Sequence, residues 1–112
     1  MSYQVRVLAR ARQDVDDIVS WIATRSSTGA ERWVSQFEKA LVGLERNPWV
    51  ASLAPESEAI GEEIRQILFR TRAGRTYRAL FLVFENEVRI LRVRGSGQAP
   101  VTRDDLGRSD IG

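Results

Sequence analysis

The chain has 112 residues, of which 43% are hydrophobic and 29% are charged, as is typical of one globular domain. It contains no cysteine and no histidine, which excludes disulfides, thiolate metal sites, thiol catalysis and a histidine general base. The formal net charge is only +2, but residues 65–94 hold eight arginines and two acidic residues, so this segment favours acidic partners such as nucleic acid or acidic protein.

The first predicted elements are a strand and a helix. Tyr3, Val5 and Val7 alternate with polar residues, which is the pattern of a half-buried strand. Residues 11–27 then repeat apolar side chains at i, i+3, i+4 and i+7, which predicts an amphipathic helix with an apolar stripe of Val15, Ile18, Val19 and Ile22. Three aspartates fall in its first turns, where the helix dipole favours anions, and we interpret them as structural and not as a metal site: Asp14, Asp16 and Asp17.

A second helix is predicted over residues 26–48. Thr28 and Glu31 have the spacing of a capping box at its start. Asn47 and Pro48 end it, because the residue before a proline avoids the helical conformation. The short link to the first helix predicts an antiparallel helical hairpin. One face carries an apolar stripe that we assign to the core: Trp33, Phe37, Ala40, Leu41 and Leu44.

The second half of the chain is predicted to be a loop followed by three strands. Residues 48–63 contain two prolines and no clear period, so we expect a loop with one short turn. In the tight turn at residues 85–87, Asn86 is expected to take the positive φ. The middle run is apolar on both faces, which predicts a central strand covered on both sides. The three strand-like runs are 64–71, 76–85 and 88–94.

These elements give the order β-α-α-β-β-β and the α+β class, with one mainly antiparallel sheet and an N-terminal helical hairpin packed on one face. We expect residues 1–106 to form a single domain and residues 107–112 to form a flexible C-terminal tail. No apolar run approaches the roughly 20 residues that span a bilayer, and the N-terminus lacks the apolar segment of a secretory signal. We therefore expect a cytoplasmic protein.

This ordered set of segments resembles the RelE/ParE superfamily, the toxins of type II toxin–antitoxin modules. The resemblance covers residues 3–106 and is carried by VRVLARARQDVDDIVSWIA, GAERWVSQFEKALVGLERNP, IRQILF, and TYRALFLVFENEVRILRVRG with the GQ that follows. Tyr77 and Arg78 open the central strand as they do in the family. The resemblance implies the RelE/ParE-like toxin fold. It also implies a growth inhibitor, of the plasmid-stabilization kind, that a cognate antitoxin holds inactive.

Two activities occur in the family that the chain resembles, and the sequence leaves both open. RelE-like members cut messenger RNA in the ribosomal A site, whereas ParE-like members bind and poison DNA gyrase. RNA cleavage needs a base, an acid and cations around the phosphorane. Gln66 and Leu68 stand where a RelE-like strand would place lysines, the sole lysine is Lys39 on the second helix, and no tyrosine follows Gly95. These departures favour the ParE-like activity. If the chain is a ribonuclease, the candidate catalytic residues are Arg70, Arg78, Arg94 and Glu63.

A binding toxin needs a surface and no acid–base pair. The predicted target-binding residues are Arg70, Arg78, Arg92 and Arg94, of which the last two share one strand face. Two structural alternatives stay open: Arg78 pairs with a carboxylate on the sheet, or Arg92 and Arg94 face solvent without a target. The predicted antitoxin-binding residues are Trp21, Arg72 and Arg75. An exposed Trp21 would anchor an antitoxin segment, because aromatic side chains dominate interface hot spots. For Trp21, which falls at the margin of its helical stripe, we favour core packing, and antitoxin binding is the alternative that stays open.

The expected partners are a cognate antitoxin and a cellular target, which is either DNA gyrase or the ribosome with its messenger RNA. An acidic antitoxin segment would suit the arginine-rich half, added as a strand at a sheet edge or laid as a helix in a groove. A heterotetramer or a larger complex with the antitoxin is left open. A third hypothesis is a family member without toxicity that only binds its antitoxin. None of these hypotheses requires a membrane, a metal or a cofactor.

Overall fold

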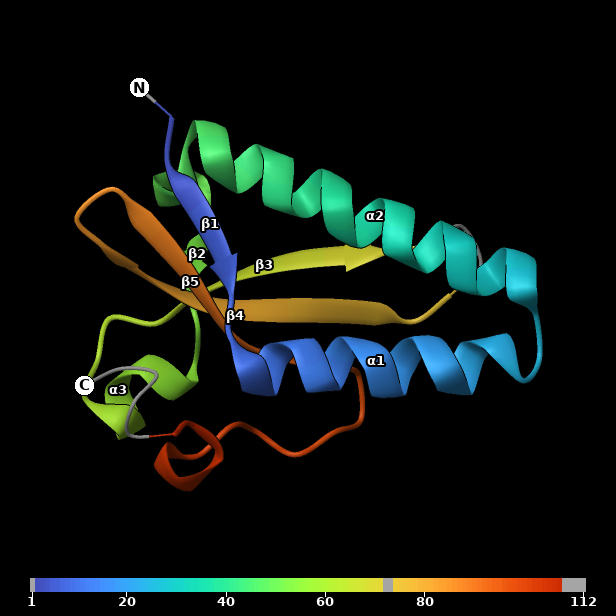
Figure 1. The fold of residues 1–112 in the computed structure, drawn as a ribbon. Coiled ribbons are helices and arrows are strands. Elements are labelled where there is room, and N and C mark those ends of the chain that lie inside the picture. The colour runs from blue at the N-terminus through green and yellow to red at the C-terminus, as the bar shows by residue number, and fades with distance from the viewer. Residues whose placement is uncertain (1, 72–73, 108–112) are drawn as a thin grey trace.

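A five-stranded sheet forms the centre of the structure, a computed structural model that describes residues 2–71 and 74–107 (Figure 1). The strands lie in the order β1-β5-β4-β3-β2, with β1 parallel to β5 and the other neighbours antiparallel. Arg72 and residues 108–112 lie outside the described part. The predicted α+β class and mainly antiparallel sheet are confirmed. The strands are β1 (Gln4–Val7), β2 (Ser52–Leu53), β3 (Arg65–Arg70), β4 (Thr76–Phe84) and β5 (Glu87–Gly95).

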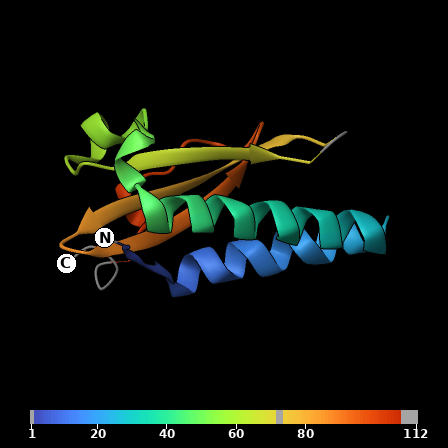
Figure 2. The same cartoon turned by 90° about the horizontal axis from the view of Figure 1, so that it is seen from above.

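Two long helices cover one face of this sheet. Helices α1 (Ala9–Ala23) and α2 (Ser27–Arg46) form the predicted hairpin and lie side by side, while the short helix α3 (Glu56–Ile60) lies on the other side of the sheet (Figure 2). The apolar stripe of α2 is buried against the strands, with Trp33 stacked on Phe37 at 5.4 Å between ring centroids. Within the described residues, no helix is long and apolar enough to cross a membrane.

The sheet has a core on each face because β4 alternates between two apolar layers. Ala79 and Phe81 lie in the layer under α1 and α2. Leu80 lies in the second layer, where it packs with Ile60 of α3 and Leu106 of the C-terminal segment. The prediction of a central strand covered on both sides is therefore confirmed. The second layer is small, because one short helix and a loop segment supply it.

A β-bulge in β5 sets the direction of the arginines that follow it. The β4–β5 register shifts between Leu80 and Phe81, whose partners are Arg92 and Ile90, so Leu91 is an extra residue. Leu91 enters the second layer, whereas Ile90 before it enters the layer under the helices. Alternation resumes after the bulge, and Val93 points toward the helices.

Connections between the elements differ from the predictions in two places. Residues 48–63 are more ordered than a loop with one turn, since a 3-10 turn (Pro48–Val50), β2 and α3 all lie within them. β2 has only two residues, too few for a period to be visible. In the β4–β5 turn, Glu85 has the positive φ of 57°, and the assignment of that conformation to Asn86 was wrong.

The starts of both long helices also differ from the predictions. α1 begins at Ala9, so the three aspartates lie beyond its first turn and cannot serve as the predicted dipole partners. Ser26, and not Thr28, caps α2, because its hydroxyl oxygen accepts a 2.9 Å hydrogen bond from the backbone N–H of Gly29. The predicted end at Asn47 and Pro48 is confirmed.

Candidate functional site

All four predicted target-binding arginines stem from the sheet face opposite α1 and α2. Each is next to a residue of the layer under the helices, and adjacent side chains of a strand point to opposite faces. Arg78 of β4 and Arg94 of β5 are direct cross-strand partners, and Arg70 pairs with Thr76 at the far end of β3. Like charges in such positions repel one another, so carboxylates are needed beside them. The neighbouring residues under the helices are Phe69, Ala79 and Val93.

Arg78 is held by Glu56, which α3 places under the sheet. One guanidinium nitrogen of Arg78 donates to Glu56 Oε1 at 2.8 Å and to Gln66 Oε1 at 3.0 Å, and the other donates to Glu56 Oε2. The backbone N–H of Val101 donates to the same carboxylate at 3.0 Å. Glu56 is only 4% exposed. The hydrogen bond from Arg78 lowers the pKa of Glu56 from 4.5 to about 2, which outweighs the opposing effect of burial.

Arg92 and Arg94 are also paired, each by a carboxylate from outside the sheet. Asp14 of α1 accepts two hydrogen bonds from Arg92, at 2.7 and 2.8 Å, and one from the backbone N–H of Val93 at 2.9 Å. Asp105 lies 3.3 Å from Arg94. Hydrogen bonds from Thr102, with the nearby charge of Arg94, lower the pKa of the Asp105 carboxyl. Arg92 and Arg94 are therefore not a solvated face.

Arg70 is the exposed member of the set. It stands beside Leu68 on the same face of β3, and Leu68 is 58% exposed. The candidate carboxylate Glu63 is not brought to these arginines, because it pairs with Arg65 at 3.2 Å. Arg65 in turn donates to the carbonyl oxygen of Ala51 at 2.7 Å. The four candidate catalytic residues therefore do not form one cluster around Glu63.

Trp21 is 48% exposed, so its assignment to the core was wrong. The guanidinium carbon of Arg25 lies 4.0 Å from the centroid of the Trp21 ring, and that of Arg75 lies 5.8 Å from it. The structure thus brings together two of the three predicted antitoxin-binding residues, and the third, Arg72, lies outside the described part. Arg25 was not predicted, although its i, i+4 spacing to Trp21 indicates such a contact.

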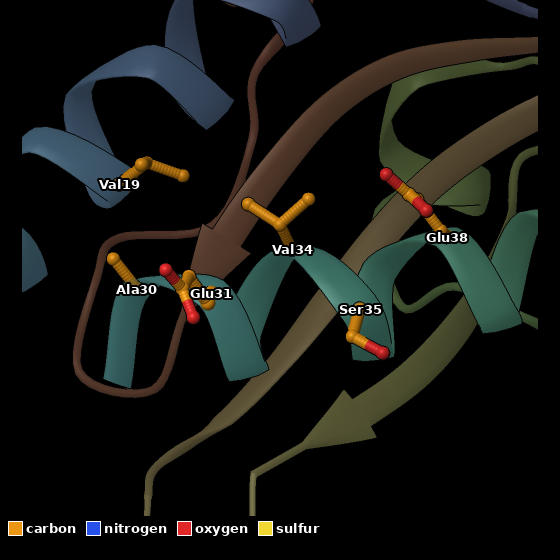
Figure 3. Close-up of a pocket in the computed structure, with 6 residues that line it drawn as sticks. All are labelled: Val19, Ala30, Glu31, Val34, Ser35 and Glu38. Atoms are coloured by element: carbon orange, nitrogen blue, oxygen red, sulfur yellow. The ribbon is translucent and has the colours of Figure 1, made fainter. Parts of the chain in front are cut away.

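A cavity lies on the helical side of the sheet, between α1 and α2 (Figure 3). It has a volume of about 410 Å³ and was not predicted. Val19 of α1 and Val34 of α2 supply apolar walls, and Glu31 and Glu38 lie along α2 beside them. These two glutamates make the cavity acidic, in contrast to the arginine-bearing face across the sheet.

Comparison with known families connects this architecture to toxins. The family described as the ParE toxin of the type II toxin–antitoxin system parDE matches residues 5–100. The chain belongs to this family. The predicted superfamily and the type II toxin–antitoxin assignment are therefore confirmed, and membership implies a cognate ParD antitoxin as a partner of this ParE toxin. No significant match to a curated protein was found.

The paired carboxylates of this ParE toxin were only partly foreseeable. Pairing of Arg78 with a carboxylate was one of the open alternatives, but the sequence did not indicate Glu56, which lies in a segment without a period. Asp14 was predicted to be structural, yet its partner Arg92 is distant in sequence, with a separation of 78 residues. Asp105 lies past the residues that the family match covers, so neither pattern nor family pointed to it.

The low pKa of Glu56 predicts a loss of stability in acid. The folded state binds this proton more weakly than the unfolded chain does, so its contribution is complete above pH 4.5 and disappears as the pH falls toward about 2. That contribution is about 3 kcal/mol. Urea unfolding at pH 7 and at pH 3 should differ by about 2 kcal/mol from this group, because the folded carboxyl is still mostly ionised at pH 3. A matched Glu56→Gln variant should show a smaller fall in unfolding free energy between the two pH values. If the unfolding free energy of Glu56→Gln falls with pH as steeply as that of the unmodified protein, the loss of stability in acid does not come from Glu56.

Proposed function

We propose that this ParE toxin stops growth by binding DNA gyrase through the face that carries Arg70, Arg78, Arg92 and Arg94, and that it does not cut RNA. The supporting observation is that Glu56, the carboxylate that faces Arg78, has a lowered pKa and oxygens that already accept hydrogen bonds. A general base works best with a pKa near the operating pH, whereas the pKa of Glu56 is lowered to about 2. Its oxygens already accept hydrogen bonds from Arg78 and Val101.

The remaining groups on this face favour binding over acid–base chemistry. Arginine stays protonated, so it is a poor proton shuttle. The chain has no histidine, and its single lysine, Lys39, lies on α2 on the other side of the sheet. A binding surface needs only fixed charge and contact area. Arg70 and Leu68 offer an exposed cation beside an exposed apolar side chain, and the ion pairs hold Arg78 and Arg94 in place behind them.

A supercoiling assay with purified gyrase tests this function. The toxin is expected to inhibit supercoiling, and expression without antitoxin should arrest growth with a DNA-damage response and an intact transcript pool. Arg70→Glu should raise the inhibitory concentration roughly tenfold, because it reverses an exposed charge at the contact. Lys39→Glu reverses an exposed charge on α2 and should leave inhibition unchanged, which makes it the matched control.

Unimpaired supercoiling at saturating toxin would refute the gyrase target. Codon-phased messenger RNA cuts on translating ribosomes, lost in Arg78→Ala, would instead establish the ribonuclease alternative. Harmless expression in the absence of the antitoxin would establish the non-toxic alternative. Each result separates one hypothesis from the other two.

A further inference from the structure

A cavity of about 190 Å³ lies beside Trp21, at the end of the sheet where β4 begins and β5 ends. Trp21 and Ile18 of α1 form one wall, and Tyr77 of β4 forms another. Pockets that enclose small-molecule ligands have volumes of about 300–1,000 Å³. This cavity is smaller and matches one large side chain of a protein partner. The other lining residues are Asp17, Arg75, Gly95, Ser96 and Gln98.

The walls of this cavity are held in place by the core. Tyr77 makes an edge-to-face contact with the buried Trp33, at 5.5 Å between ring centroids, and stacks on Phe69 at 6.0 Å. A side chain added at Gly95 would come within 3.0 Å of the Tyr77 ring, so the ring lies directly on the glycine. A site that is already ordered before binding loses little entropy when a partner docks.

Arginines make the mouth of the cavity cationic. Arg25 and Arg75 are exposed and approach Trp21 from two different segments, the end of α1 and the start of β4. A guanidinium that stacks on a ring keeps its N–H donors in the guanidinium plane, where they fit a carboxylate. Asp17 also lines the cavity, and its Oδ1 accepts a 2.8 Å hydrogen bond from Gln13.

The composition is that of a binding site and not of ordinary surface. Trp, Tyr and Arg are the residues enriched in interface hot spots, and all three types meet here. Burial of a half-exposed aromatic side chain by a partner is favourable, because it removes apolar surface from water. Arg25 and Arg75 favour an acidic segment as the partner that covers Trp21, because a basic segment would be repelled.

We propose that this cavity is the docking site for a segment of the cognate antitoxin that carries a large apolar side chain next to a carboxylate. The apolar side chain enters between Trp21 and Tyr77, and the carboxylate pairs with Arg25 or Arg75. The proposal rests on the antitoxin partner that family membership implies, and it is independent of the gyrase target.

The docking site and the arginine-bearing face are on opposite sides of the same strands. Tyr77 belongs to the layer under the helices, whereas its neighbour Arg78 and the cross-strand partner Arg94 belong to the other face. Substitutions in the cavity should therefore weaken antitoxin binding while growth arrest persists. Substitutions at Arg70 should do the reverse.

Calorimetric titration of the purified toxin with the antitoxin encoded in the same parDE module tests the proposal. Trp21→Ala is expected to weaken binding about 30-fold, as truncation of an aromatic hot spot does, and Arg75→Glu roughly tenfold. Trp49→Ala is the matched control, because Trp49 is 47% exposed and also lies against an arginine, Arg65, at 5.1 Å. It should change the affinity less than about threefold.

Affinities of Trp21→Ala and Arg75→Glu within threefold of the unmodified toxin would overturn the proposal. An equal loss in Trp21→Ala and Trp49→Ala would overturn it too, because the effect would not be local to the cavity. Loss of gyrase inhibition in Arg75→Glu with antitoxin affinity retained would assign the cavity to the target instead. Arg75 is exposed and directly precedes β4, so this variant reports on binding even if Trp21→Ala is poorly folded.

Discussion

Replacing Glu56 with alanine is expected to lower the free energy of unfolding by about 3 kcal/mol. The substitution leaves the half-buried guanidinium of Arg78 without its carboxylate and removes the acceptor of the Val101 N–H. The expected loss is at the lower end for a broken buried pair, because the side chain of Arg78 keeps 21% of its surface in water. Thermal unfolding should shift downward by more than about 10 °C.

Glu58→Ala is the matched control for this prediction, since Glu58 lies on the same short helix and is exposed. It should change the unfolding free energy by less than about 0.5 kcal/mol. The effect of Glu56→Ala should also shrink in acid, where the native carboxyl of the unmodified toxin takes up its proton. A loss below 1 kcal/mol at neutral pH would show that the ion pair contributes little beyond its desolvation cost.

Replacing Asp14 with alanine is expected to cost about 3 kcal/mol as well, for a different structural reason. β1 pairs with β5 only as far as Ile90, and beyond that point the Asp14 carboxylate accepts the N–H of Val93 in place of a strand. The same carboxylate binds two nitrogens of Arg92. The substitution therefore breaks the link between α1 and the end of β5, which urea unfolding measures.

Asp16→Ala is the matched control for Asp14, because Asp16 lies two residues away on α1 and is exposed. Asp14→Asn keeps an acceptor for the Val93 N–H but loses the charge, so it should fall between Asp14→Ala and the unmodified protein. Equal stabilities for Asp14→Ala and Asp16→Ala would refute the role of Asp14 as the acceptor that replaces a strand beside Val93.

Much of the fold was predictable because its signals are local. The half-buried stripe of Val15, Ile18, Val19 and Ile22 and the stripe around Trp33 recur at helical spacing, and both helices formed as predicted. The apolar run on both faces of β4 indicated a central strand, and the two core layers confirm it. The exceptions are elements too short to have a period, β2 and α3, and the capping by Ser26, where neighbouring hydroxyl residues compete for one position.

The candidate site was less predictable because the arginines alone do not determine their surroundings. Strand alternation correctly placed Arg92 and Arg94 on one face. The solvent exposure of these two side chains was not predicted correctly, because carboxylates from α1 and from the C-terminal segment pair with them. The prediction for Trp21 was wrong in the opposite direction. Trp21 lies at the margin of its helical stripe, and it is half-exposed instead of packed in the core.

The sequence by itself determined the order of elements, the basic character of the second half and the absence of the residues that most acid–base sites use. Only the tertiary structure decided which carboxylate meets each arginine. Glu56 and Asp14 are separated from Arg78 and Arg92 by 22 and 78 residues. Periodicity reports on residues within a few turns or strand positions, whereas an ion pair forms wherever packing brings two charges together.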